Sequence, residues 1–319
     1  DVSDAAGNAA AQVTSSSFTV DTTAPTVLYI TGAENNGTFK AGDVINISAR
    51  LSEVITVTGT PQLTLNVGST YDVDYSSGTT TEYLNFAYTV QAGHTSADLD
   101  YASTSALALN SGTITDAAGN AAVLTLASPG ATNSLSSAKN YVIDTTAPTI
   151  TGTTIASNNS TISVTLSEAV YDTNGGSGAL EVGDFVLSIS GGSATVAATP
   201  SSISSSGNVY TLGLTLSGTP NGSETLTVNP ASSSIYDAVG NAASTTQSNN
   251  TVTLNDQAAP SISAIATSAL SWGAVLNATE DNSAGTVTVT TSGAEDGQTV
   301  TITLNSATYT GSVSSNGAT

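Results

Sequence analysis

The chain repeats itself at a spacing of more than 100 residues, and this periodicity restricts the possible folds more than any other feature. The phrase Asp-Ala-x-Gly-Asn begins at positions 4, 116 and 237, which are 112 and 121 residues apart. A second phrase follows each copy, as VDTTAPT at 20–26, IDTTAPT at 143–149 and LNDQAAPS at 254–261. Solenoid repeats are about 20–50 residues long. The longer spacing therefore predicts tandem domains of ordinary size.

These phrases set the expected domain boundaries. We predict complete repeats at residues 25–147 (the first repeat) and 148–259 (the second repeat), and a partial third repeat at 260–319. Residues 1–24, here called the N-terminal segment, carry the phrases that close a repeat and are expected to be the C-terminal part of a preceding one. Since the chain begins in the middle of a repeat, we expect the natural protein to extend beyond both ends.

Alternation of apolar and polar residues with a period of two dominates each repeat and predicts β-strands. Examples are VINISARL at 44–51, TISVTLSE at 161–168 and NVYTLGLTL at 208–216. Residues 285–305 are expected to form a hairpin, because a turn-rich stretch separates two alternating runs. No helical pattern is evident. About seven strands per repeat predict an all-β fold of tandem immunoglobulin-like, Greek-key β-sandwiches without a helical domain.

The charge balance excludes several partners and favours a cation. The chain has 24 acidic and 3 basic residues, a formal net charge of −21. Nucleic acids and anionic membrane surfaces are not expected as partners, because binding to either requires clustered Lys and Arg. No apolar run reaches the length of about 18 residues that crosses a membrane. Cysteine is absent, so the chain has no disulfides. Unpaired carboxylates repel one another unless a cation offsets them, and Ca²⁺ prefers oxygen ligands.

The sandwich topology brings three distant acidic phrases to one end of each repeat. These are the linker aspartate, the glutamate of a turn after the second strand (Leu-Ser-Glu at 51–53 and 166–168) and the aspartate of the Asp-Ala-x-Gly-Asn turn. The predicted Ca²⁺ ligands are Asp21, Glu53 and Asp116; Asp144, Glu168 and Asp237; and Asp256 with Glu280 or Asp281. Asp172 and Asn174 could add oxygens at the second site, and positive φ is expected at Gly119 and Gly240.

A simpler alternative remains open for the acidic turns. Asp and Asn in turns commonly accept hydrogen bonds from their own backbone without any ion. The spacing also differs from that of an EF-hand loop. What favours a metal is the recurrence of the three phrases together at every expected junction.

The chain resembles the bacterial immunoglobulin-like tandem repeats of large surface adhesins. The resemblance is carried by AGDVINISARLSEVITVTGTPQLTLNVGS at 41–69, LSEAVYDTNGGSGALEVGDFVLSISGG at 166–192 and SGAEDGQTVTITLNSATYTGSV at 292–313. It implies a secreted or cell-surface extender whose junctions are stiffened by Ca²⁺. The acidic positions of the family match Asp21, Glu53, Asp116, Asp144, Glu168, Asp237 and Asp256. The third junction departs from the pattern, because NDQAAPS replaces DTTAPT.

Catalysis is not expected. His94 is the only histidine, and no cysteine is available for a nucleophilic dyad. Carboxylates that recur at every junction indicate a joint rather than a single catalytic pair. Two alternatives to an extender remain: a glycan- or protein-binding module using Trp272 and tyrosines, and a filament subunit. In the filament, residues 13–20 of one chain would complete the third repeat of another.

Overall fold

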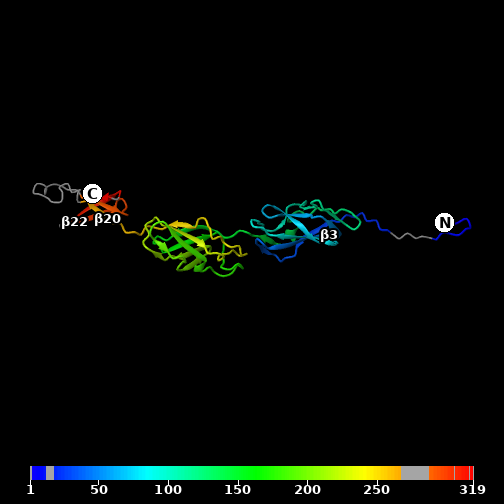
Figure 1. Ribbon diagram of the computed structural model, residues 1–319, viewed down its shortest axis with the longest axis horizontal. Helices are drawn as coiled ribbons and strands as arrows, with labels where there is room; N and C mark the ends of the chain where they lie inside the picture. The colour runs from blue at the N-terminus through cyan, green and yellow to red at the C-terminus, as the bar shows by residue number, and fades with distance from the viewer. Residues whose placement is uncertain (1, 12–17, 267–286, 305, 316, 319) are drawn as a thin grey trace. The chain divides into compact units, whose positions relative to one another are not determined.

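The computed structural model describes residues 2–11, 18–266, 287–304, 306–315 and 317–318 (Figure 1). It is 45% strand and 2% helical, so the predicted all-β class without a helical domain is confirmed. The chain forms two compact units. The first comprises residues 1–147, 174–176 and 238–241, and the second comprises 148–173, 177–237 and 242–319.

The first unit contains an eight-stranded sheet and a two-stranded sheet. The large sheet has the order β1-β3-β6-β5-β4-β7, with β8 paired to β4 and β9 paired to β3, and β10 pairs in parallel with β2. The elements are β1 (Val27–Gly32), β2 (Gly37–Phe39), β3 (Val44–Thr58), β4 (Gln62–Asn66), β5 (Thr70–Ser77), β6 (Thr81–Thr89), β7 (Asp100–Tyr101), β8 (Leu107–Ala108), β9 (Thr113–Thr115), the short helix α1 (Leu135–Ala138) and β10 (Tyr141–Ile143).

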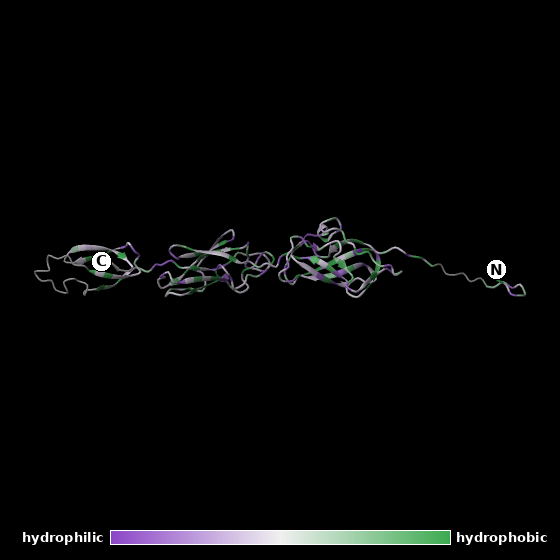
Figure 2. Cartoon of the chain, turned by 90° about the horizontal axis from the view of Figure 1, so that it is seen from above, coloured by the Kyte–Doolittle hydropathy of each residue, from purple (hydrophilic) through white to green (hydrophobic). Residues whose placement is uncertain are grey.

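Alternation along these strands builds the core. In β3 the buried residues are spaced by two, at Ile45, Ile47, Ala49 and Leu51, as expected for a pleated strand with one face against the core. Figure 2 shows hydrophobic residues concentrated on the strands of this unit. The core of the first repeat runs from Ile30 to Ile143.

The predicted turn at Leu-Ser-Glu is wrong for the first repeat. β3 continues through Glu53 to Thr58, because the β-branched run from Val54 favours a strand. Its first part pairs with β1 and β6, and after a register shift between Arg50 and Ile55 its last residues pair with β9. Glu53 therefore lies where β3 changes partners, next to the strand that leads into Asp116.

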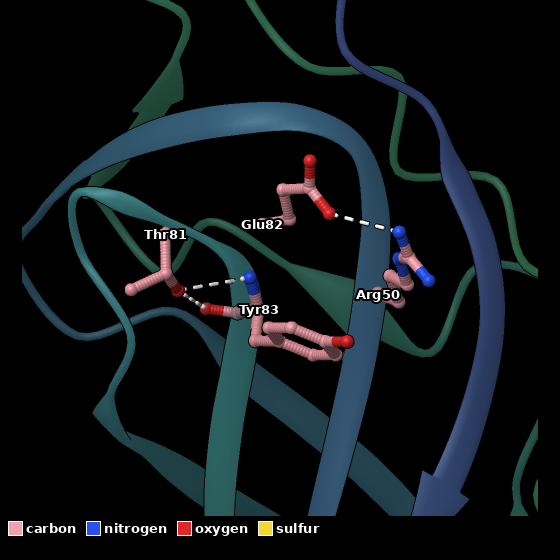
Figure 3. Close-up of polar contacts among 4 residues, drawn as sticks. All are labelled: Arg50, Thr81, Glu82 and Tyr83. Atoms are coloured by element: carbon pink, nitrogen blue, oxygen red, sulfur yellow. Dashed lines mark hydrogen bonds and ion pairs between the residues drawn. The ribbon is translucent and has the colours of Figure 1, made fainter.

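A surface ion pair lies on the same sheet. The guanidinium of Arg50 on β3 is 3.0 Å from the carboxylate of Glu82 on β6, as Figure 3 shows. Beside it, the Thr81 hydroxyl accepts the backbone N–H of Tyr83 at 3.0 Å. Both charged side chains are more than one third exposed, so the pair contributes little stability.

The second unit contains the second repeat, with its own core from Ile150 to Leu254. Its sheets have the orders β11-β12-β16-β15, β13-β18-β19 and β14-β17. The elements are β11 (Ile150–Ile155), β12 (Thr161–Leu166), the 3₁₀ turn Val182–Asp184, β13 (Phe185–Ser190), β14 (Thr195–Val196), β15 (Ile203–Ser206), β16 (Val209–Gly213), β17 (Leu216–Ser217), β18 (Thr225–Pro230) and β19 (Thr251–Thr253). Here β12 ends before Glu168, as the predicted turn requires.

The described part of the third repeat is a five-stranded sheet in the order β20-β21-β24-β23-β22. Its strands are β20 (Ser261–Ala266), β21 (Thr288–Ser292), β22 (Thr299–Leu304), β23 (Ala307–Ser314) and β24 (Gly317–Ala318). The predicted hairpin of residues 285–305 is wrong. β21 pairs with β20 and β24, whereas β22 pairs with β23, because the pair Leu304–Ala307 closes a much tighter turn than residues 293–298.

The three repeats share one local irregularity. In each repeat, the first strand pairs antiparallel with the next core strand. The pairing register changes between the second and the fourth residue after the linker proline. The shifts lie at Val27–Tyr29, Ile150–Gly152 and Ile262–Ala264. This common β-bulge aligns the repeats residue by residue.

A fully buried carboxylate in the second repeat is held by three backbone N–H groups. Glu224 has no exposed surface. Its Oε1 accepts the backbone N–H groups of Ser193 and Ala194 at 3.1 and 3.2 Å, and its Oε2 accepts that of Asn221 at 2.9 Å. Burial acts to raise the pKa of Glu224, but these hydrogen bonds outweigh it and hold the pKa below the usual 4.5.

We expect Glu224→Gln to lower the thermal midpoint of the second repeat at pH 7, because an amide nitrogen would face one of the three N–H donors. A carboxylate with a depressed folded pKa contributes stability above its unfolded pKa, and this contribution is lost as pH falls through the folded value. The difference between wild type and variant should therefore shrink below about pH 4.5. Thermal unfolding by circular dichroism between pH 7 and 3 measures it, and a constant difference would contradict the assignment.

Candidate metal centre

The Asp-Ala-x-Gly-Asn turn of the first repeat is closed by its own aspartate. The backbone N–H of Asn120 donates to Asp116 Oδ1 at 2.8 Å, and its side-chain amide donates to Oδ2 at 2.7 Å. Gly119 has φ 94° and Gly240 has φ 90°, so the predicted positive φ is confirmed at both. Asp116 therefore does accept hydrogen bonds from its own turn, as the simpler alternative predicted. Each of its carboxylate oxygens can still accept a further bond or bind a cation.

The linker aspartate is held against this turn. The side-chain amide of Asn120 also donates to the backbone oxygen of Asp21 at 3.2 Å. Asp21 Oδ1 accepts the N–H of Thr23 at 3.0 Å, which forms an Asx turn. Asn120 thus joins the linker to the turn, and Asp21 is placed beside Asp116.

The third carboxylate is brought in by β3. Ser52 fixes the chain beside Glu53: its N–H donates to the oxygen of Thr26 at 2.9 Å, and its hydroxyl accepts the N–H of Thr26 at 3.0 Å. As a result, carboxylate oxygens of Asp21, Glu53 and Asp116 all lie within 4.8 Å of one another. All three residues belong to the first compact unit.

The electrostatics of this group reflect crowded negative charge. Burial raises the pKa of Glu53, and the charges of Asp116 and Asp21 raise it further. Burial also acts to raise the pKa of Asp116, but its hydrogen bonds from Asn120, Gly119 and Ala118 outweigh this and lower the pKa. Asp116 is only 5% exposed. The group therefore combines one firmly ionised carboxylate with one whose charge is disfavoured by its neighbours.

Among the described residues, no basic side chain forms an ion pair with this group. Of the three basic residues, Arg50 pairs with Glu82, Lys139 donates to the backbone oxygen of Glu34, and Lys40 donates to the backbone oxygen of Gly240 at 3.3 Å. A divalent cation fits the donor set, since three carboxylates converge at a distance suited to shared coordination. Backbone oxygens and water would supply the remaining ligands.

The second predicted group has the same composition. It consists of Asp144, Glu168 and Asp237, a second acidic group that could hold a metal ion, and Asp237 is 1% exposed. The Asn241 amide donates to the backbone oxygen of Asp144 at 3.1 Å, as Asn120 does to Asp21. Two groups of acidic residues could therefore hold a metal ion.

The third predicted group differs. Asp256 accepts the N–H of Ala258 at 2.7 Å, so its linker turn is retained. Glu280 and Asp281 lie outside the described residues. The shared bulge aligns Gly293, the residue that follows β21, with Glu53 and Glu168, because Ile262 pairs with Thr291 as Val27 pairs with Leu51. Within the described chain, the third junction thus lacks the glutamate.

Of the two additional ligands predicted for the second site, Asp172 is not in the group. Asp172 belongs to neither acidic cluster found among the described residues. Its Oδ1 is buried without a hydrogen-bond partner, close against Gly178. The contribution of Asn174 stays a prediction.

Sequence reasoning did not assign the serine and asparagine that position these carboxylates. Ser52 and Ser167 each accept the N–H of the residue after the linker proline, both at 3.0 Å. Asn120 and Asn241 each donate to a linker carbonyl. The sequence contained a signal for these roles, because the serine recurs in Leu-Ser-Glu and the asparagine recurs in Asp-Ala-x-Gly-Asn.

The ring of His94 packs against two tyrosines of the first repeat. Its Nδ1 lies 2.8 Å from the hydroxyl of Tyr88, and its ring also packs against Tyr71. Burial lowers the pKa of His94. Trp272 lies outside the described residues.

No protein-family model matches the chain, and searches of the curated proteins and of the solved structures likewise gave no match. The two acidic groups are therefore the features of the chain that bear on its function.

Proposed function

We propose that the chain is a structural extender segment of a large repetitive protein, secreted or held at a bacterial cell surface, and that Ca²⁺ stiffens its linkers. The observation that carries the proposal is the recurrence of one three-carboxylate group, with a linker aspartate in each copy. A bound ion would fix the linker to the repeat that follows it. One such connection between linker and repeat is needed for each repeat, which matches the recurrence of the three-carboxylate group.

Calcium is favoured over other divalent ions by the ligand chemistry. All the donors are oxygens, and the chain offers no cysteine thiolate. Mg²⁺ demands a small octahedral site and keeps several waters, whereas Ca²⁺ accepts irregular sets of about 6–8 oxygens. Asp21 and Asp144, which come from the linkers, are the residues through which an ion would limit linker motion.

The proposal makes neighbouring repeats the main partners of each repeat, and it assigns no catalytic role. Among the described residues, no helix has the length and apolarity needed to cross a membrane.

Small-angle X-ray scattering of the whole chain tests the extender role. Adding millimolar Ca²⁺ to metal-free protein is expected to narrow the distribution of interatomic distances, because a fixed linker samples fewer conformations. EGTA should reverse the change. A Glu53→Gln, Glu168→Gln double variant should not respond to Ca²⁺.

Glu82→Gln is the matched control, since it removes one carboxylate from the first repeat without touching either group. It should respond to Ca²⁺ as the wild type does. Identical scattering with Ca²⁺ and with EGTA, in a wild type that binds Ca²⁺ by calorimetry, would reject the extender role. Absence of calorimetric binding would reject the metal itself.

A further inference from the structure

The first compact unit takes in two short segments that the sequence assigns to the second repeat. These are residues 174–176 and 238–241, and the latter form the acidic turn that follows Asp237. Their tertiary contacts group them with the first repeat. The linker aspartate Asp144 belongs to the same unit, and its backbone oxygen accepts the Asn241 amide at 3.1 Å. The end of the first repeat, the linker and this turn are therefore parts of one packed body.

One basic side chain reaches the acidic turn inside this unit. The ammonium of Lys40 donates to the backbone oxygen of Gly240 at 3.3 Å, although the two residues are 200 positions apart in the chain. Both residues are partly buried. A hydrogen bond from an ammonium is charge-assisted, and partial burial protects it from screening by salt. Because the acceptor is a carbonyl oxygen, the contact uses none of the carboxylates of the acidic group.

The first repeat positions Lys40 beside the linker. Strand β2 pairs in parallel with β10, so that Phe39 lies opposite Ile143 at the ends of the two strands. The N–H of Asp144 donates to the oxygen of Phe39 at 2.9 Å. The N–H of Lys40 donates to Asp43 Oδ2 at 2.9 Å, which fixes the backbone of the lysine. Lys40 and the linker aspartate therefore continue side by side from two paired strands.

Lys40 lies in a connection that is longer than its counterpart in the second repeat. From the linker aspartate to the glutamate of Leu-Ser-Glu, the distance along the chain is 32 positions in the first repeat and 24 in the second. Residues 33–43, which include β2, join β1 to β3, whereas residues 156–160 join β11 to β12. Since the second repeat pairs the same strands through a short turn, strand pairing does not require the longer connection. This difference favours a further role for the element that carries Lys40.

A comparison of the two turn glycines shows how closely Lys40 approaches. Gly119 and Gly240 occupy the same position of the phrase and have φ of 94° and 90°. A methyl group on Gly119 would meet no atom within 4 Å among the described residues. On Gly240 it would lie 2.6 Å from Lys40 Nζ and would overlap the backbone oxygen of Asn174. The turn at Gly240 is therefore enclosed by Lys40 and by a backbone segment of the same unit.

We propose that Lys40 is a metal-independent tie between the first repeat and the acidic turn of the second. Its ammonium holds the turn through Gly240, and Asn241 holds the linker. The linker after Asp144 is therefore restrained before any ion binds, and a bound ion adds to this restraint. The inference goes beyond the proposed function, because the tie requires neither Ca²⁺ nor the three carboxylates.

Pulsed electron paramagnetic resonance of the whole chain in EGTA tests the tie. The native chain has no cysteine, so Leu109→Cys and Val186→Cys, at positions 39% and 44% exposed, place one spin label in each repeat. We expect a narrow component in the distribution of distances between the labels. Lys40→Met keeps an apolar stem but removes the donor, so the narrow component should be lost. Lys40→Arg should retain it, because a guanidinium also donates to carbonyl oxygens.

Lys139→Met is the matched control for the loss of a lysine. Lys139 also donates to a backbone oxygen, that of Glu34 at 2.7 Å, but within the first repeat, so its loss should leave the distances unchanged. A second pair of variants keeps the charge. Gly240→Ala should broaden the distribution by displacing Lys40. Gly119→Ala, which has the same backbone strain without a close neighbour, should not.

Two results would overturn the tie: a distribution that stays narrow in Lys40→Met, and a wild type that is already broad in EGTA. A broad wild type that narrows only when Ca²⁺ is added would support the proposed function alone. A narrow wild type that Lys40→Met broadens, with no response to Ca²⁺ in either protein, would support the tie and reject a metal at this junction. Circular dichroism checks that each variant is folded, and the glycine pair decides if Lys40→Met is not.

Discussion

Saturating Ca²⁺ is expected to raise the thermal midpoint of the first repeat by roughly 10 °C relative to the protein in EGTA. One site at about a hundredfold excess over its dissociation constant contributes about 2.7 kcal/mol to the native state. For a domain of little more than 100 residues, about 1 kcal/mol shifts the midpoint by a few degrees. Differential scanning calorimetry measures the change directly.

The effect of Glu53→Gln on stability should differ between EGTA and Ca²⁺, which would not be expected of a glutamate with a purely structural role. The raised pKa of Glu53 means that its charge is disfavoured in the metal-free fold. The variant should therefore be at least as stable as wild type in EGTA, yet less stable in Ca²⁺. Glu82→Gln should leave the calcium-dependent gain unchanged. Equal destabilisation of Glu53→Gln in both buffers would contradict a metal role for this residue.

The rise in thermal midpoint that Ca²⁺ causes should also depend on pH. An acid with a raised folded pKa destabilises the fold above that pKa, and this cost disappears as pH falls and the group takes up a proton. In EGTA, the Glu53 contribution should therefore become less unfavourable in acid. Protons compete with Ca²⁺ for the same oxygens, so the gain from Ca²⁺ should be largest near neutral pH and should decline below it.

Tyr141→Ala is expected to destabilise the first repeat by about 3–5 kcal/mol, the typical cost of removing a large buried aromatic ring. Tyr141 is fully buried in β10, contacts Phe39 edge-on at 5.2 Å between ring centroids, and donates its hydroxyl to the oxygen of Glu34 at 2.8 Å. Because domains are stable by only about 5–15 kcal/mol, the variant should unfold at a much lower urea concentration.

Two further variants separate the contributions of the Tyr141 side chain. Tyr141→Phe keeps the ring and loses one hydrogen bond, so a cost of about 1 kcal/mol is expected. Leu109→Ala, at an exposed position of the same repeat, should change stability by less than about 0.5 kcal/mol. A small effect of Tyr141→Ala would mean that β10 does not close the core of the first repeat.

Much of the local structure follows from the sequence. Alternation with a period of two is a property of a few consecutive residues, so the strands at 44–51, 161–166 and 209–213 were predictable. The positive φ of Gly119 was predictable for the same reason, since a tight turn with Asp and Asn requires it. The convergence of two acidic groups was also predicted, because their phrases recur in a fixed order.

Pairing between strands was less predictable. Residues 285–305 have the pattern of a hairpin, but which strand lies beside β21 is decided by the partners available in the whole repeat. In the same way, the shared phrase Leu-Ser-Glu does not distinguish the strand that continues through Glu53 from strand β12, which ends before Glu168; the β-branched residues after Glu53 do so only in part. Pairing with β9 extends β3, the strand that contains Glu53, to Thr58.

The sequence by itself determined that the chain is all-β, that its acidic phrases recur, and that Asp21, Glu53 and Asp116 belong together with their counterparts Asp144, Glu168 and Asp237. Only the tertiary structure decided that Asn120 joins the linker to the turn and that Gly293 occupies the position of the glutamate at the third junction. The physical reason is that side-chain periodicity is local, whereas burial and register depend on residues distant in the chain.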